Sequence, residues 1–119
     1  MSKEIPPNVQ QQLLRLQQLQ QTLSALLAEK QRLEVELAEI NNALEELDKV
    51  DESAVIYKVV GPILVKVNKD RLTVELKDRK ELTETRLKIL EKQDAKMRAQ
   101  IESVQKDIQR IMSGQQASS

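Results

Sequence analysis

The sequence contains no cysteine, no histidine, no phenylalanine and no tryptophan, and Tyr57 is its single aromatic residue. Without cysteine or histidine, the chain can form no disulfide, no Cys/His zinc site and no catalytic triad that depends on imidazole. Its two glycines are too few for a glycine-rich phosphate-binding loop. Compact cores usually draw much of their buried area from aromatic side chains. These absences argue against a globular core and against an enzyme, and we expect neither a metal nor a cofactor.

Charge of one sign is also lacking, because 19 basic residues balance 19 acidic ones. A chain without a strongly basic stretch is not expected to bind nucleic acid or an anionic membrane. No apolar run approaches the roughly 20 residues of a membrane span, and the start MSKEIPPNVQ lacks the apolar segment of a signal peptide. We therefore expect a cytoplasmic protein.

Leucine, glutamine, glutamate, lysine and alanine dominate what is present, and this is the composition of long helices. Residues 7–50 show a heptad repeat without an internal glycine or proline, and Pro6 and Pro7 suit a helix start. Ten of the twelve positions that would form the seam are apolar, which predicts a coiled-coil helix. Position a falls on Val9, Leu16, Leu23, Lys30, Leu37 and Leu44, and position d on Gln12, Leu19, Leu26, Leu33, Ile40 and Leu47.

A second heptad repeat predicts another helix over residues 70–112. Asn68 or Asp70 suits its N-cap, Ser113-Gly114 suits its end, and residues 113–119 are expected to form a disordered tail. Its positions a are Lys80, Leu87, Asp94, Ile101 and Ile108, and its positions d are Leu76, Thr83, Leu90, Met97, Val104 and Ile111.

Residues 55–67 between the two repeats are rich in β-branched side chains and are interrupted by Gly61-Pro62. This pattern predicts a β-hairpin in which Val60 pairs with Ile63. Both faces would be largely apolar, and a lone two-stranded hairpin is marginal in water. We therefore expect it to associate with hairpins of other chains, through Val55, Tyr57, Val59, Val60, Ile63, Val65 and Val67.

The predicted fold is mainly α, with one domain in which an antiparallel two-helix coiled coil is joined by one β-hairpin. The heptads permit two alignments of the helices. Val9 faces Ile111 in the first alignment, whereas Leu16 faces Ile111 in the second. The first makes the helix ends flush, and we favour it.

Lys30 and Asp94 are charged residues at seam positions and occupy adjacent layers in either alignment. One interpretation is a chance interruption of the seam, with Lys30 extending its ammonium group into solvent. The other is an ion pair that sets the alignment of the helices. Neither interpretation involves catalysis, and paired glutamates on the helix faces are expected to be solubilising charge.

The start of the first helix combines apolar side chains with a scarcity of charge, since Arg15 is the single charged residue between residues 5 and 28. Several apolar residues lie off the seam, namely Leu13, Leu14 and Met112. A wider helix interface would explain them, and so would an apolar surface left open for a partner. The partner surface would comprise Ile5, Val9, Leu13, Leu14, Leu16, Ile108, Ile111 and Met112.

Three stretches of this sequence resemble the β-type subunit of archaeal prefoldin: IPPNVQQQLLRLQQLQQTL, AVIYKVVGPILVKV, and the heptad helix after KDRLTVELK. The resemblance covers residues 5–112. The α-type subunit has two hairpins between its helices, whereas residues 51–69 have room for one.

The resemblance implies a hexamer of two α-type and four β-type subunits, in which hairpins assemble into a body of β-barrels. It also implies ATP-independent holding of non-native polypeptides, largely at the coiled-coil tips, and their transfer to a group II chaperonin. The alternative function is a structural coiled-coil adaptor or spacer between two defined partners. That alternative explains the helices but not a hairpin that is apolar on both faces.

Overall fold

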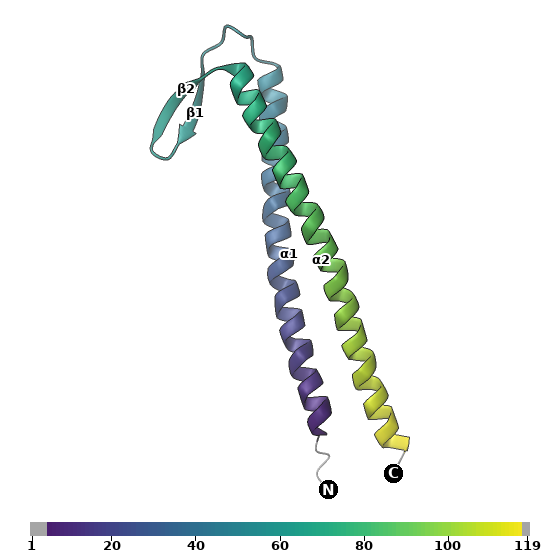
Figure 1. Ribbon diagram of the computed structural model, residues 1–119. Coiled ribbons are helices and arrows are strands. Elements are labelled where there is room, and N and C mark those ends of the chain that lie inside the picture. Colours follow the sequence, from purple (N-terminus) through teal and green to yellow (C-terminus); the bar gives the residue numbers. More distant parts are fainter. Residues whose placement is uncertain (1–4, 118–119) are drawn as a thin grey trace. The chain divides into compact units, whose positions relative to one another are not determined.

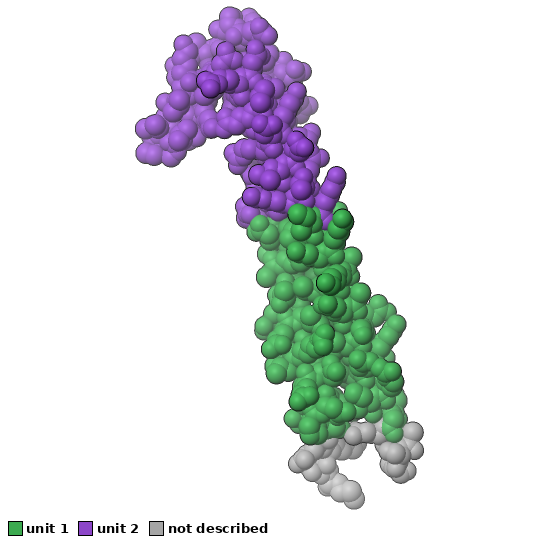
Figure 2. Space-filling model, in the orientation of Figure 1, with its two compact units in different colours: residues 1–30, 89–119 green, residues 31–88 purple. Residues whose placement is uncertain are grey.

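The computed structural model describes residues 5–117 and has the predicted order of elements, helix, hairpin, helix (Figure 1). Helix α1 spans Pro7–Asp48, strands β1 and β2 span Ile56–Val60 and Ile63–Val67, and helix α2 spans Lys69–Ala117. The chain divides into two compact units, shown in different colours in Figure 2. Unit 1 combines residues 1–30 with 89–119, and unit 2 is the continuous stretch 31–88.

Local signals in the sequence start both helices. Pro7 is the first residue of α1, where the missing N–H of proline costs nothing, and the Pro6 carbonyl accepts the N–H of Gln10 at 2.9 Å. Asn68 is the N-cap of α2, because its Oδ1 accepts the backbone N–H of Asp70 at 2.8 Å and of Arg71 at 3.4 Å. Of the two N-cap candidates from the sequence, Asn68 and Asp70, Asn68 is therefore the N-cap in the structure.

Helix α1 ends at Asp48, two residues before the predicted end at Val50. A 3₁₀ turn follows the helix. In it, Lys49 N–H donates to the Glu46 carbonyl and Val50 N–H donates to the Leu47 carbonyl, each three residues back. The Lys69 ammonium donates to the Val50 carbonyl at 2.7 Å. A cation at this position satisfies a free carbonyl and interacts favourably with the negative end of the helix dipole.

The predicted end of the second helix is wrong. Helix α2 continues through Ser113 and Gly114 to Ala117, so the predicted disordered tail is helical as far as that residue. A glycine ends a helix when it adopts a left-handed conformation, and Gly114 has no positive φ. Glycine inside a helix costs only about 1 kcal/mol relative to alanine. Residues 118 and 119 of the predicted tail lie outside the described residues.

The heptad prediction is confirmed in both units, because every predicted seam position is buried or half-buried. The most buried seam residues of unit 2 include Leu33, 1% exposed, and Thr83, the latter a polar residue at position d. In each unit, the core is therefore the row of contacts between a segment of α1 and a segment of α2.

The ion pair between Glu36 and Arg79 in unit 2 decides between the two alignments of the helices. Glu36 Oε1 lies 3.0 Å from an Arg79 guanidinium nitrogen. With a rise of about 1.5 Å per residue, the two residues are offset along the axis by about 7.5 Å when Val9 would face Ile111, and by about 18 Å in the other alignment. Only the smaller offset can be bridged by these side chains, so unit 2 has the alignment we favoured from the sequence.

The hairpin has the predicted register, with Val60 paired to Ile63 and Ile56 to Val67. Gly61 has a φ of 55°. The next residue is Pro62, whose ring fixes its own φ near −65°. A turn whose first central residue has a positive φ and whose second has a negative φ is of type II′. This turn type matches the twist of the two strands.

Candidate functional site

Unit 2 presents the hairpin as an apolar surface. Val59 is 71% exposed, and Tyr57, Leu64 and Val55 on the same face are exposed as well. On the other face, Val67 and Ile56 are half-buried. Of the residues predicted to mediate assembly, Val67 alone is half-buried, and the other six are exposed. We call these seven residues the hairpin surface: Val55, Tyr57, Val59, Val60, Ile63, Val65 and Val67.

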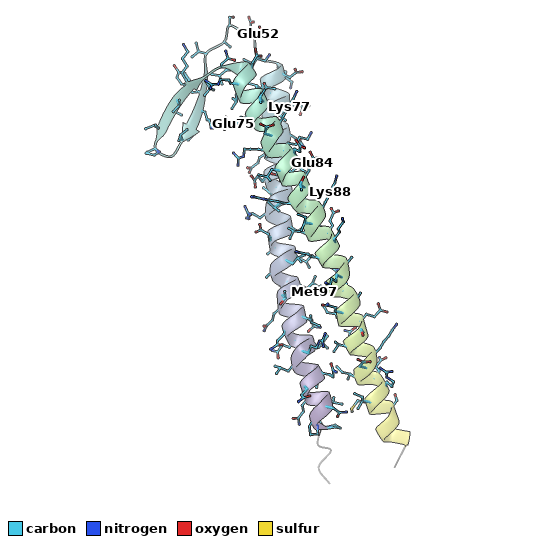
Figure 3. The ribbon with its side chains drawn as sticks, viewed as in Figure 1. Glu52, Glu75, Lys77, Glu84, Lys88 and Met97 are labelled. Atoms are coloured by element: carbon cyan, nitrogen blue, oxygen red, sulfur yellow. The ribbon has the colours of Figure 1, made fainter. Side chains whose placement is uncertain are left out.

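Contacts with α2 hold the hairpin in place. Lys58 on β1 forms an ion pair with Glu75, which lies on the side of α2 that faces the hairpin (Figure 3). A groove between the two elements is lined by Val65 and Val67 from the hairpin and by Leu72 from α2, among others. One hairpin face is therefore turned to the chain's own helix, whereas the opposite face is turned to solvent.

Unit 1 carries the second apolar surface, at the start of α1 and toward the end of α2. We call its eight predicted residues the end surface, and the structure sorts them into three groups. Ile5, Leu13, Leu14 and Met112 are exposed, and Leu14 is the most exposed of these at 57%. The seam residues Leu16, Ile108 and Ile111 are half-buried. Val9 is 2% exposed.

Val9 is therefore buried in this conformation, and its predicted place in the end surface depends on local opening of the helices. It occupies position a, and the opposite helix covers it. It becomes available only when the helices separate locally. Leu13 and Met112 both occupy position e, on the same side of the helix pair, and this explains why the seam does not bury them.

Gln12 places a polar group in the seam beside Val9. Its side-chain carbonyl oxygen is buried and has no hydrogen-bond partner among the described residues. A buried polar group without a partner costs about 1–3 kcal/mol. This layer therefore stabilises the helix pair less than an apolar layer would.

Of the two interpretations of Lys30 and Asp94, the structure favours the ion pair. Lys30 Nζ lies 4.0 Å from Asp94 Oδ2, and the other carboxylate oxygen of Asp94 bonds to Arg98 one turn further along α2. The two side chains of the pair remain partly exposed, at 25% and 13%. The pair thus belongs to a small charged network on unit 1, and nothing in its geometry resembles a catalytic site.

Sequence reasoning missed a groove on unit 1 between α1 and α2. Its floor includes the seam residue Leu26, and its walls include Thr22 and Ala25. The signal was present in the sequence, because small residues flank a large seam residue at these positions.

Within residues 5–117, no group of three or more acidic, cysteine or histidine side chains could hold a metal ion. In the same part of the chain, no helix combines the length and the apolar character needed to cross a bilayer. Two exposed apolar surfaces, the hairpin surface and the end surface, are therefore the candidate functional sites.

Comparison with known proteins gives a consistent result. The family model described as prefoldin subunit matches residues 10–115. The prefoldin subunit beta of Sulfolobus acidocaldarius is 40% identical over 113 residues, which cover 95% of this chain and 90% of the relative. The prefoldin subunit beta of Saccharolobus islandicus (strain L.S.2.15) is 46% identical over the same length and with the same coverage.

A solved structure agrees with these relatives. The crystal structure of the prefoldin beta subunit from Thermococcus strain KS-1 matches with a TM-score of 0.84 and 37% identity, over 92% of this chain and 96% of that one. Prefoldin is a family of chaperones and not of enzymes. From the two heptad helices, the single hairpin and these matches, we conclude that the chain belongs to the prefoldin family, as a subunit of the β type.

Proposed function

We propose that this chain is a subunit of an ATP-independent holding chaperone in the cytoplasm. Through the hairpin surface it joins α-type partners, two α with four β subunits, in a body of β-barrels. Through the end surface it captures non-native polypeptides, which are then delivered to a group II chaperonin. The observation that carries the proposal is the exposure of Leu13 and Leu14 in a segment almost free of charge, together with the exposed Met112 on α2.

The chemistry of the end surface suits partners without a fixed sequence. Leucine and methionine side chains adapt to irregular apolar shapes, and glutamine offers hydrogen bonds without a fixed charge. Little charge has to be desolvated when an apolar segment binds. Weak contacts from several arms of an oligomer would together give high avidity.

Local opening would enlarge the end surface. Helix ends open at low cost in free energy, and the unpartnered Gln12 carbonyl lowers that cost further. Opening exposes Val9, Leu16, Ile108 and Ile111, so the seam residues of the prediction become available to the same client.

The test is suppression of client aggregation by a variant that carries Leu13→Ser, Leu14→Ser and Met112→Ser. Light scattering would follow a chemically unfolded client, and size-exclusion chromatography would follow assembly with the α-type partner. We expect the variant to assemble normally and to lose most of its ability to hold the client. The matched control replaces Val35, Leu82 and Ile89 by Ser, because these three are comparably exposed but lie outside the end surface.

Undiminished suppression by the assembled triple variant would overturn the role of the end surface. The adaptor alternative makes a different prediction. An adaptor would bind two defined partners and would leave unrelated unfolded proteins to aggregate, even in its unmodified form.

A further inference from the structure

The groove on unit 1 is separate from the end surface and has a volume of about 510 Å³. This lies within the roughly 300–1,000 Å³ that is typical of ligand sites. Met97 is part of it and lies on α2 between the two helices (Figure 3). The lining residues are Thr22, Ala25, Leu26 and Glu29 from α1, and Leu90, Gln93, Lys96, Met97 and Gln100 from α2.

The groove exists because the seam is covered on one side only. Leu26, Leu90 and Met97 are seam residues and form its floor. On the far side of the seam, the half-buried Leu27 at position e covers the same layer. On the groove side, the corresponding places are taken by Thr22 and Ala25, whose side chains are too short to reach across. Apolar seam atoms are therefore accessible without any opening of the helices.

The rim of the groove carries no net charge. Glu29 and Lys96 contribute one charge of each sign, and Thr22, Gln93 and Gln100 contribute neutral polar groups. A glutamine side chain has both donors and acceptors, so it can bond to either backbone group of a peptide. Such a rim favours an uncharged stretch of polypeptide over a strongly charged one.

We propose that this groove binds an extended, uncharged and apolar segment of a non-native polypeptide. The inference rests on the proposed function and adds a second client contact to it. Gln93 and Gln100 lie about 10.5 Å apart along α2, from a rise of about 1.5 Å per residue. Three residues of an extended chain, at about 3.3 Å each, span nearly the same distance. The two amides can thus bond to backbone groups of one bound segment while its side chains reach the floor.

A second copy of this chain suits the groove less well. The rim carries Glu29 and Lys96, and a helix packed over it would have to desolvate both charges. An extended segment is narrow and leaves them in water.

Single cysteines test the site directly, because the chain contains no cysteine of its own. Ala25→Cys places a thiol in the groove, and Ala28→Cys places one on the exposed outward face of the same helix. The probe is reduced, carboxymethylated α-lactalbumin, which stays unfolded, added to the assembled protein. We expect saturating probe to slow alkylation of the Ala25→Cys variant by iodoacetamide about fivefold or more, and to leave the Ala28→Cys variant unchanged.

Filling the groove gives an independent measurement. Ala25→Met should weaken affinity for the same probe about five- to tenfold, whereas Ala28→Met, the same change outside the groove, should have no effect. Thermal unfolding followed by circular dichroism checks that both variants remain equally helical. A loss of affinity that is accompanied by a loss of helicity does not support the inference, and the alkylation rates then decide it.

The outcomes separate the two proposals. If the end-surface variant loses client holding but the Ala25 variants behave like the Ala28 variants, the groove inference is wrong and the proposed function stands. If alkylation of the Ala25→Cys variant slows with its own concentration and without probe, a second copy occupies the groove, and the inference is overturned. If the unmodified assembly does not bind the probe at all, both proposals fail.

Discussion

The hairpin and the helix ends both expose apolar side chains, but they expose different kinds. The hairpin surface consists of β-branched residues and one tyrosine, held in a defined register by paired strands and by the ion pair between Lys58 and Glu75. Three of the four exposed residues of the end surface, Leu13, Leu14 and Met112, are not β-branched, and they lie beside glutamines. β-Branched side chains have few rotamers, whereas methionine and leucine have more freedom. The first surface therefore suits a partner of fixed shape, and the second suits partners of variable shape.

Replacing Val59 and Val65 together by Lys should have the largest effect, since it acts on the surface of fixed shape. The two residues lie on opposite hairpin faces, and each buried valine contributes about 1.5 kcal/mol or more to association. We expect assembly with the α-type partner to weaken at least a hundredfold, a change of about 2.7 kcal/mol. Native mass spectrometry would show a smaller assembly, and circular dichroism would show that it remains helical.

The control for this pair is Val35→Lys with Leu82→Lys, which adds two charges at exposed helix positions of the same unit. The control variant should assemble normally. Full assembly of the Val59/Val65 variant would show that the hairpin is not the interface, and the contrast between the two surfaces would then collapse.

Seam and end-surface leucines should differ strongly in their contribution to stability. Leu33→Ala removes a fully buried side chain and should lower the free energy of unfolding by about 2–5 kcal/mol. Leu14→Ala should change it by about 0.5 kcal/mol or less, because Leu14 is exposed. Urea unfolding of the two variants measures the difference. A large loss for Leu14→Ala would mean that this residue packs against a further helix rather than awaiting a client.

The turn of the hairpin should be sensitive to backbone conformation rather than to space. A Cβ atom at Gly61 would meet nothing within 4 Å, yet its φ of 55° is unfavourable for other residues. Gly61→Ala should therefore cost about 1–2 kcal/mol of hairpin stability. We expect a titration with the α-type partner to show weaker assembly, and circular dichroism to show unchanged helicity. No change in assembly would indicate that the hairpin surface tolerates variable geometry, as the end surface does.

The smallest expected effect concerns the charged pair in the seam of unit 1. Partly exposed ion pairs contribute about 1 kcal/mol or less, and buried aliphatic side chains can replace them without loss. Lys30→Leu with Asp94→Leu should therefore raise the melting temperature by a few degrees. A lower melting temperature than that of the parent would show that the pair, together with Arg98, stabilises the seam more than apolar contacts do.

Elements with a periodic or local signal were predictable from the sequence. The heptads gave every seam position, Gly61-Pro62 gave the hairpin register, and the contact between Lys30 and Asp94 followed from the two repeats together. The flush alignment, however, needed the bond between Glu36 and Arg79. An exposed charged residue has several possible ion-pair partners on the opposite helix, and a heptad pattern does not show which of them it contacts.

The errors have specific physical causes. Glycine and serine weaken a helix without ending it, so α2 passes Gly114. The groove beside Leu26 arises from what Thr22 and Ala25 leave unfilled, and a search for large apolar residues overlooks such places.

The way the two units are distributed along the chain has a consequence for folding. Unit 2 is one continuous stretch, whereas unit 1 joins the first 30 residues to the last 31. A ribosome delivers unit 2 whole before the second half of unit 1 has been synthesised. The entropic cost of closing the loop between the two segments of unit 1 rises only slowly with loop length, by about 0.6 kcal/mol for each doubling. The two segments can pair, however, only after residues 89–119 have been synthesised. The leucine-rich start of α1 is therefore unpaired for most of translation, and its many glutamines keep it hydrated during that delay.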